Sequence, residues 1–234
     1  MRSLVDIWPP YAVRITEGDL TLTPVTDDDL PGLVDLAGSG IHDPARMPFS
    51  APWTDADPAD LPANLVRYYS GTRSQFTPDS FSLQLAVRVG GELVGVQGFE
   101  AHDFAVTRTG ETGSWLALRH QGRGTGTRMR RALCAFLFDE LGAVEVASGA
   151  FLDNPASLAV SRKVGYRPNG VVRLVRRPGE VAVNQRLVLT PATFVRAEPV
   201  HTAGGAELRA FLRLDVTPAG APQPSSPAVE ASQG

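Results

Sequence analysis

The sequence has little of what disulfide-bonded, zinc-binding and membrane proteins require. It contains one cysteine, four histidines and no apolar run of about 18 or more residues. A single cysteine, Cys134, excludes an intramolecular disulfide, and the histidines lack the companions of a zinc site, so we expect no metal. The N-terminal segment also lacks the apolar region of a signal peptide, which predicts a cytoplasmic protein with no membrane partner.

The charge of the chain is weakly negative overall and strongly positive in one place. A formal net charge of −3 argues against a nucleic-acid partner, which would need basic charge over a whole face. The stretch RHQGRGTGTRMRRAL, from Arg119 to Leu133, nevertheless holds three glycines and five arginines, and no acidic residue occurs between Thr112 and Phe138. Such a local cluster predicts the binding of one small anionic ligand.

Hydrophobic periodicity predicts a mixed α/β fold, and 234 residues with 43% hydrophobic content are enough for a substantial core. Alternation predicts strands at 12–26 (a hairpin-like pair or a first strand), 81–89, 92–100, 111–118, 144–151, 170–177 and 181–190. Helical spacing predicts helices at 30–37, 61–73, 126–141, 156–166 and 205–214.

Composition divides the chain into four parts. We expect an N-terminal arm at 1–17, loose over its first twelve residues, then a main domain at 18–190, a C-terminal helical extension at 191–215 and a disordered Pro/Ala/Ser-rich tail at 216–234. Inside the domain, the Pro-, Gly- and Asp-rich segment 38–60 is longer than an ordinary connection and carries three large apolar side chains, Met47, Phe49 and Trp53. Its length predicts a functional lid.

The glycine-arginine stretch lies between a predicted strand and a predicted helix. Glycines let backbone N–H groups point at one anion, and the start of a helix adds its dipole and its unpaired amides, so phosphate is the expected ligand. The P-loop of nucleotide hydrolases needs a lysine after its last glycine, and none follows here. The dinucleotide fingerprint fails because Thr127 stands in place of its third glycine and the loop is not after a first strand.

Two linked motifs fit a different phosphate loop. Gln121, Gly124 and Gly126 form the pattern Q-x-x-G-x-G. Further along, NPAS at 154–157 is followed by a predicted helix and by a glycine and a tyrosine at 165–166. With ETGSWL leading into the loop, the sequence resembles the GNAT acyltransferase superfamily and, within it, the RimJ/RimL-type N-acetyltransferase branch.

The resemblance covers about residues 18–190 and implies the GNAT fold, a central mixed β-sheet flanked by helices. Two parallel strands of that sheet, here 113–118 and 144–149, would splay apart, and the pantetheine arm of acyl-coenzyme A would pass between them. It implies acetyl-CoA, or another acyl-CoA, as co-substrate. The implied coenzyme contacts are Trp115, Leu116, Leu118, Gln121, Gly122, Arg123, Gly124, Thr125, Gly126, Thr127, Asn154 and Ser157.

Within that set, the resemblance implies distinct roles. The amides of 122–127 would bind the pyrophosphate, with Arg123 as a charge partner. An amide near Trp115 or Leu116 would bind the thioester oxygen and stabilise the developing oxyanion. Further along the helix, three arginines would either add to phosphate binding or form a solvated face: Arg128, Arg130 and Arg131.

The reaction implied by the resemblance is direct attack of a primary amine on the thioester, without a covalent enzyme intermediate. A general base must take the proton of the amine. Glu111, at the head of the strand, is the expected base because it shares a strand face with Trp115. Glu100 and Asp103 are rivals, and Glu111 could also be an ordinary strand-end carboxylate.

A hydrogen-bond donor to the departing thiolate is the second expected catalytic group. Many family members carry a tyrosine where this sequence has Ser161, so the sequence departs from the pattern. Ser157 occupies the position of the usual substitute in this branch and is our first choice, with Ser161 second. Both serines could instead be ordinary helix residues, and Asn154 also suits helix capping.

The lid at 41–54 is expected to form the acceptor pocket, although its aromatic residues would suit a core plug or a subunit contact equally well. Transfer of a succinyl group would need a buried cation in the lid, and Arg46 or His42 could serve. Cys134 lies among apolar helix residues, which favours an inert core residue over an acyl-accepting nucleophile.

The sequence therefore predicts an acyl-CoA-dependent N-acyltransferase that moves an acetyl group, or alternatively a succinyl group, to a small-molecule or protein amine. The alternative is a non-catalytic module that binds or senses acyl-CoA, because the usual tyrosine is missing. A homodimer is the default expectation for the assembly.

Overall fold

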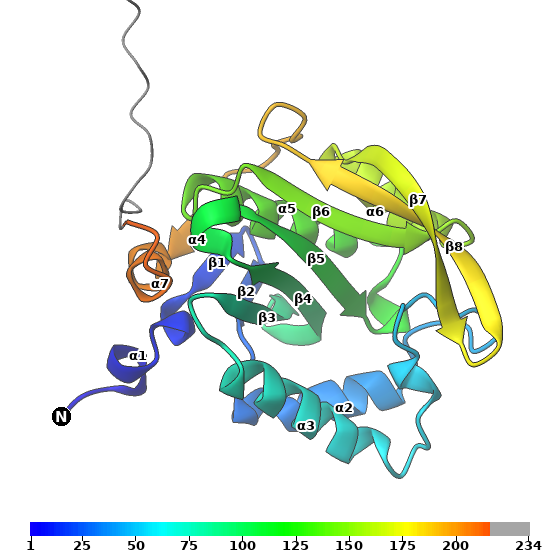
Figure 1. Cartoon of the computed structure of the whole chain (residues 1–234). Coiled ribbons are helices and arrows are strands. Elements are labelled where there is room, and N and C mark those ends of the chain that lie inside the picture. The colour runs from blue at the N-terminus through cyan, green and yellow to red at the C-terminus, as the bar shows by residue number, and fades with distance from the viewer. Residues whose placement is uncertain (216–234) are drawn as a thin grey trace, which may run out of the picture.

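The structure is a computed structural model that describes residues 1–215, so the predicted tail at 216–234 lies outside the described residues. It contains a nine-stranded mixed sheet in the order β7-β8-β6-β5-β4-β3-β2-β1-β9 (Figure 1). The strands are β1 (Arg14–Glu17), β2 (Leu20–Pro24), β3 (Ser80–Val89), β4 (Glu92–His102), β5 (Thr109–Leu116), β6 (Glu145–Phe151), β7 (Arg167–Arg177), β8 (Glu180–Leu189) and β9 (His201–Ala203). Neighbouring strands are antiparallel except β5 and β6, which are parallel.

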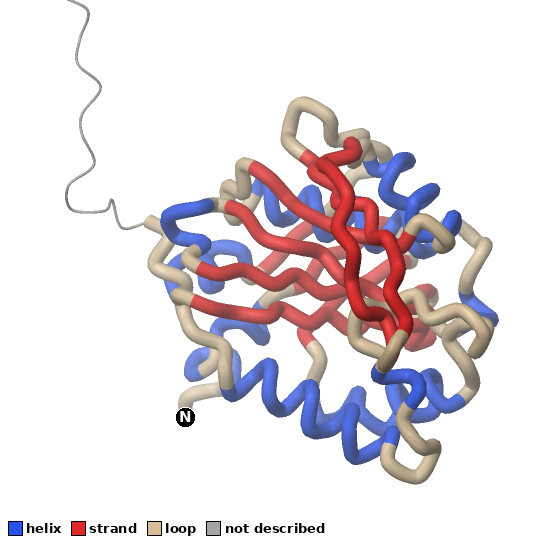
Figure 2. Tube along the Cα trace, turned by 45° about the vertical axis from the view of Figure 1, so that its right-hand side comes forward, coloured by secondary structure: helices blue, strands red, loops and turns tan. Residues whose placement is uncertain are grey.

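Helices cover both faces of this sheet. They are α1 (Leu4–Ile7), α2 (Leu30–Gly38), α3 (Leu61–Ser74), α4 (Phe104–Thr107), α5 (Thr125–Asp139), α6 (Pro155–Val164) and α7 (Gly205–Phe211). The pair α2 and α3 lies on one face and the pair α5 and α6 on the other (Figures 1 and 2). The expected class, a mixed sheet flanked by helices, is confirmed. No helix among residues 1–215 is long and apolar enough to cross a bilayer.

Glycines form the tight turns that the sequence predicts. Gly90 and Gly91 join β3 to β4 with φ values of 57° and 87°, and Gly179 turns β7 into β8 with a φ of 76°. Only glycine adopts this left-handed region without strain, so these residues define where each hairpin reverses.

The core forms between the sheet and α5. As the periodicity predicts, α5 buries Met129, Leu133, Phe136 and Leu137 completely or nearly so, and Gly142 follows its end with a φ of 68°. Cys134 lies in the same buried layer, with its Sγ 3.6 Å from the hydroxyl of Tyr166. Burial raises the pKa of the Cys134 thiol to about 11.

Three local differences from the sequence predictions have clear physical causes. Residues 1–12 form helical turns rather than a loose arm, because the ring of Trp8 packs against Phe76 and Phe211 at centroid distances of 5.8 and 5.4 Å. β5 ends at Leu116, and Leu118, which we expected on the strand, begins a 3₁₀ turn and is 54% exposed. The short β9 is an additional strand whose pairing with β1 only the fold brings about.

A thiol-labelling experiment tests the environment of Cys134. At pH 8 a thiol with a pKa of about 11 is ionised in only about one molecule in a thousand, and the side chain is fully buried. Native protein should therefore react with Ellman's reagent at least ~100-fold more slowly than protein unfolded in guanidinium chloride. Rapid stoichiometric labelling of the native protein would contradict this assignment.

Candidate functional site

The parallel strands β5 and β6 separate soon after they meet. Their pairing covers Thr109–Glu111 against Glu145–Ala147 and no further in the described chain. Beyond it, side chains replace the backbone ladder: the hydroxyl of Thr112 lies 3.3 Å from the carbonyl oxygen of Ala147, and that of Ser148 lies 3.3 Å from the carbonyl oxygen of Thr112. Beyond Thr112 the edge of β5 therefore has no strand paired with it, which is the arrangement that an extended ligand can use.

The loop that follows β5 presents free amides at the start of α5. Gly122 and Gly124 have φ values of 73° and 85°, and Gly124 is the N-cap of α5 without a side-chain cap. The amides of 122–126 donate no hydrogen bond to another described residue. The expected set extended to Thr127, but the amide of Thr127 donates to the carbonyl oxygen of Gly124 at 3.0 Å. The available donors therefore end at Gly126.

Gln121 connects this loop to two other segments. Its side-chain Nε2 donates to the carbonyl oxygens of Ile41, at 2.6 Å, and Leu116, at 2.9 Å. The glutamine of the Q-x-x-G-x-G pattern thus joins the loop to the end of β5 and to the lid. Both hydrogens of its Nε2 are therefore used to hold the loop in place.

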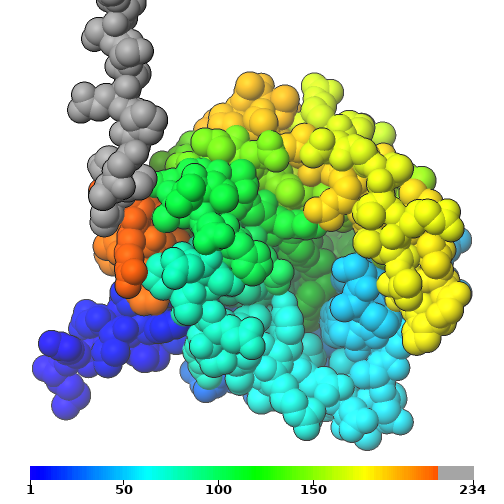
Figure 3. All heavy atoms as spheres, in the orientation of Figure 1, coloured from blue at the N-terminus to red at the C-terminus, as the bar shows by residue number. Residues whose placement is uncertain are grey.

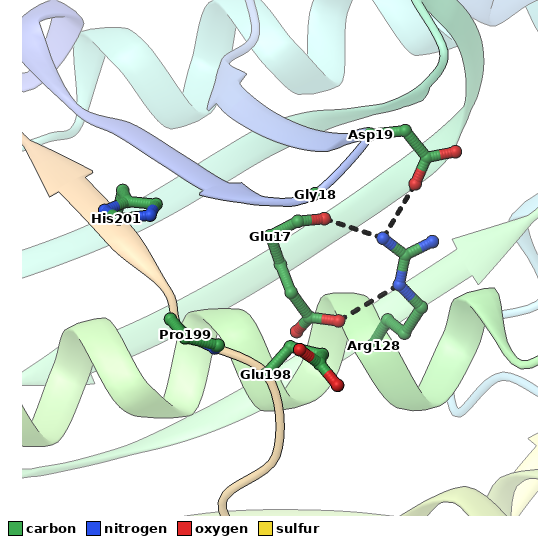
Figure 4. A pocket seen from close by; sticks show the side chains of 7 residues that line it. All are labelled: Glu17, Gly18, Asp19, Arg128, Glu198, Pro199 and His201. Carbon is green, nitrogen blue, oxygen red and sulfur yellow. Dashed lines mark hydrogen bonds and ion pairs between the residues drawn. The ribbon is translucent and has the colours of Figure 1, made fainter.

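The basic residues of the stretch have different surroundings. Arg123 is exposed on the loop itself. Arg128 is bound on the far side of α5, where it donates to the carboxylates of Glu17, at 3.0 Å, and Asp19, at 2.8 Å, beside a hollow of about 500 Å³ (Figure 4). Arg128 is therefore neutralised by acids, and Arg123 is the cation best placed beside the free amides.

Arg130 is buried, with 4% of its surface exposed. Its two terminal nitrogens donate to the hydroxyls of Ser148 on β6 and Ser114 on β5, both at 3.0 Å. Because these serines lie beyond the last paired residues, the guanidinium bridges the separating strands from the α5 side.

The second motif forms the start and the end of α6. The side-chain oxygen of Asn154 accepts the amide of Ser157 at 3.1 Å, so Asn154 caps the helix. Ser157 is half-buried in the first turn, whereas Ser161 is fully buried and its hydroxyl has no hydrogen-bond partner among the described residues. At the C-terminus, Gly165 has a φ of 107°, and a Cβ there would lie 2.0 Å from the carbonyl oxygen of Thr193. Only glycine fits this position.

The opposite face of the sheet carries an ion pair. Glu111 on β5 accepts both terminal nitrogens of Arg186 on β8, at 3.2 and 2.8 Å. The guanidinium reaches across β6, where Ala147 and Gly149 are small enough to leave room. Glu100 lies directly opposite Glu111 on β4, and among the described residues it accepts a hydrogen bond only from the hydroxyl of Ser82, at 3.2 Å. Two carboxylates thus lie side by side here, and one of them is already paired with a cation.

Asp103, the third candidate base, lies apart from these two carboxylates. It has a positive φ of 50° and precedes α4, beyond the end of β4. The structure brings together Glu111 and Glu100 on one strand pair and does not bring Asp103 to that position.

The lid packs aromatic rings over this same face. Phe49, Trp53 and Trp115 form a chain with centroid distances of 5.4 and 5.8 Å, and the indole nitrogen of Trp115 donates to the hydroxyl of Tyr69 at 3.3 Å. Met47 is almost completely buried. Trp115 therefore meets the lid with its side chain, and its carbonyl oxygen lies against Gly95 of β4 rather than in the strand gap.

The β7–β8 hairpin closes the other side of this face. Arg177 at its tip donates to both carboxylate oxygens of Asp55, at 2.6 and 2.9 Å, and to the carbonyl oxygen of Pro44 at 2.8 Å. The surface is hollowed between the lid, in cyan, and the hairpin, in yellow (Figure 3). The lid and α3 thus lie on the face of the sheet that carries the carboxylates of β4 and β5, and the hairpin contacts the lid through Arg177.

The lid residues considered for carboxylate recognition are not suited to it. The ring of His42 is occupied by the carbonyl oxygen of Asp43, at 2.8 Å, and the hydroxyl of Thr54, at 2.7 Å, and Arg46 is exposed. The lid among the described residues therefore lacks the buried cation that binding of a succinyl carboxylate in the lid would need. Residues 1–215 also contain no group of three or more His, Cys, Asp or Glu side chains placed to hold a metal ion.

The positions of two charged residues in this region, Arg186 and Arg130, follow from the fold rather than from the local sequence. Arg186 is 75 residues from Glu111, and nothing in the local sequence indicates their pairing. Arg130, in contrast, has a local signal. It precedes the buried Leu133 by three positions, so both residues lie on the same side of α5. A basic residue next to a buried helix stripe is a signal that could have singled it out.

Comparisons with known proteins agree with this geometry. The Acetyltransferase (GNAT) domain family matches residues 19–167 of the 234-residue chain. YdaF of Bacillus subtilis (strain 168), whose name assigns it provisionally to the ribosomal N-acetyltransferases, is 35% identical over 68 residues. That match spans 29% of this chain and 37% of YdaF, so the chain covers little more than a third of this relative.

Solved structures share the fold at low identity. RimJ of Mycobacterium smegmatis, in complex with CoA-disulfide, matches with a TM-score of 0.65 at 18% identity, over 87% of this chain and 95% of RimJ. Spermidine N-acetyltransferase from Vibrio cholerae, in complex with CoA and spermine, matches with a TM-score of 0.60 at 16% identity, over 76% and 99%. RimL, the ribosomal L7/L12 alpha-N-protein acetyltransferase, matches with 0.60 at 16%, over 74% and 94%.

The family match covers more than half of the chain, and it includes the separating strands, the loop of free amides and the helix α5 that follows. The chain belongs to the GNAT acetyltransferase family, as the resemblance of its two motifs predicted.

Proposed function

We propose that this protein is an acyl-CoA-dependent N-acyltransferase that moves an acetyl group to a primary amine by direct attack in a ternary complex. The observation that carries the proposal is the run of free amides at 122–126, at the uncapped start of α5 and beside the gap between β5 and β6. Unpaired N–H groups at a helix N-terminus bind phosphate oxygens through hydrogen bonds and the helix dipole.

The coenzyme contacts follow from this placement. The amides of 122–126 would bind the pyrophosphate, with the exposed Arg123 supplying charge, and the edge of β5 would pair with the pantetheine amides. Of the two candidates for the thioester oxygen, we favour the amide of Leu116. The next amide, of Ala117, donates to Val94 on β4 at 3.1 Å, and successive amides of a strand point to opposite edges, so the amide of Leu116 faces the gap.

On the acceptor face, we propose Glu111 as the general base and Glu100 as its rival. Glu111 has the position that the family resemblance implies, whereas its two oxygens are shared with Arg186. Glu100 has no cationic partner among the described residues and accepts only a serine hydroxyl. A proton would leave the ammonium of the acceptor for one of these carboxylates, directly or through water.

Ser157 is the proposed donor to the departing thiolate. Its half-buried hydroxyl makes no hydrogen bond to another described residue and lies in the first turn of α6, where the helix dipole also favours negative charge. Ser161 remains second because it is fully buried.

The names of similar proteins suggest the class of acceptor. YdaF and RimL are named for ribosomal protein acetylation, and the Vibrio cholerae enzyme for spermidine. We favour a protein amine for this chain and keep a small polyamine as the alternative. A cytoplasmic location and a homodimer belong to this proposal as well, and a module that only binds acyl-CoA is the alternative function.

Titration calorimetry with coenzyme A tests the loop. A Gly124→Val substitution places a β-branched residue at a φ of 85° and should weaken coenzyme A binding at least ~10-fold, because the amides would turn away from the phosphates. Gly170→Val is the matched control, since Gly170 has a similar φ of 83° in β7 and open space around it. No binding to the wild type, or equal binding by both variants, would contradict the proposal.

Steady-state kinetics of two carboxamide variants separates the candidate bases. Glu111→Gln should lower kcat about 100-fold, the lower end of what a general base contributes, while calorimetric binding of acetyl-CoA stays unchanged. Glu100→Gln should lower kcat less than about fivefold. The reverse order would assign the base to Glu100, and no effect of either would remove both.

Thiol release distinguishes an enzyme from a binding module. Protein incubated with acetyl-CoA and a panel of N-terminal peptides, lysine peptides and spermidine should release free thiol with at least one acceptor. Ser157→Ala should slow that release about 10-fold or more, because the departing thiolate loses a hydrogen-bond donor. Tight coenzyme binding without release for any acceptor would support the binding module.

A further inference from the structure

The buried guanidinium of Arg130 has no anionic partner among residues 1–215. It forms no ion pair with a described carboxylate, and its Nε has no hydrogen-bond partner although the atom is inaccessible to water. It donates hydrogen bonds to two serine hydroxyls and lies over the Tyr166 ring, whose centroid is 6.0 Å from the guanidinium carbon. Arginine stays charged even when buried, and a buried charge with neutral partners only is energetically unfavourable.

The position of Arg130 separates it from the phosphate site. It lies six residues beyond Gly124, which corresponds to about 9 Å along the axis of α5. Its side chain is directed into the sheet and ends between Ser114 and Ser148, not at the free amides of the loop. The pyrophosphate would therefore leave this positive charge unneutralised.

The acyl end of the thioester would lie much closer. Ser114 is two residues before Leu116, whose amide we assign to the thioester oxygen, and two residues of a strand span about 7 Å. A four-carbon dicarboxylic chain places its terminal carboxylate about 5 Å from the thioester carbon, given single bonds of about 1.5 Å. Such a carboxylate can approach the Arg130 guanidinium and the hydroxyl of Ser114, which can turn to donate to it. The hydroxyl of Ser148 already donates to the carbonyl oxygen of Thr112, so Ser148 serves to hold the guanidinium in place.

We infer that Arg130, Ser114 and Ser148 form an acyl-end anion site, so that the protein accepts acyl chains ending in a carboxylate, of the succinyl type, in addition to acetyl. This inference rests on the proposed function, because it uses the same coenzyme cleft. The residues that would bind the carboxylate thus lie on the α5 side of the separating strands. They are not in the lid, where the ring of His42 is already hydrogen-bonded and Arg46 is exposed.

Calorimetry with two thioesters tests the inference. Wild-type protein should bind succinyl-CoA at least as tightly as acetyl-CoA. Arg130→Met should weaken succinyl-CoA binding about 10- to 100-fold more than it weakens acetyl-CoA binding, which is the range of a charge-assisted hydrogen bond. Arg130→Lys should retain part of the succinyl-CoA affinity. Arg196→Met, which breaks an exposed ion pair with Asp139 at the other end of α5, is the matched control and should change neither.

The outcomes separate this inference from the proposed function. If wild-type protein binds acetyl-CoA but binds succinyl-CoA more than about 10-fold more weakly, the anion site is wrong and the acetyltransferase proposal stands. If a folded Arg130→Met variant, checked by thermal melting, binds both thioesters equally more weakly, the anion site is wrong and Arg130 only connects β5 and β6. Wild-type protein that binds neither thioester would overturn both proposals.

Discussion

The early separation of two parallel strands is the constraint on which the rest of this structure depends. β5 and β6 pair over only a few residues, and the hydroxyls of Thr112 and Ser148 then bond to the backbone of the opposite strand in place of the ladder. A sheet interior normally satisfies every strand edge, so an edge left open inside a sheet favours an extended ligand. The loop and the start of α5 lie at the mouth of this gap.

The sheet divides the chemistry of the site between its two faces. Because side chains alternate along a strand, Ser114 points to α5 and Arg130, whereas Glu111 and Trp115 point to the α3 and lid side. One face thus carries a buried cation with no anionic partner in the described part of the chain, and the other carries a carboxylate pair with a half-exposed arginine. The proposed transfer would occur between the two, with the acyl group held in the gap and the amine approaching from the lid side.

Much of this arrangement was predictable from local sequence. The turns at Gly90 and Gly179, the amphipathic α5 and the cap at Asn154 each follow from residue types a few positions apart, and all are present in the structure. The glycine loop was predictable for the same reason, since a positive φ at Gly124 is a property of one residue. The prediction was less accurate where Trp8 packs against a distant helix or where β5 ends two residues early.

The sequence by itself determined the family, the phosphate-type loop and the class of fold, because those depend on short spacings within one segment. Only the tertiary structure decided which charges are paired. Arg128 forms an ion pair with Glu17, and Glu111 forms one with Arg186 from β8. Arg130 is buried and donates to two serine hydroxyls. The reason is physical: the free energy of a charge depends on its burial and on neighbours from distant strands, and neither is encoded by position along the chain.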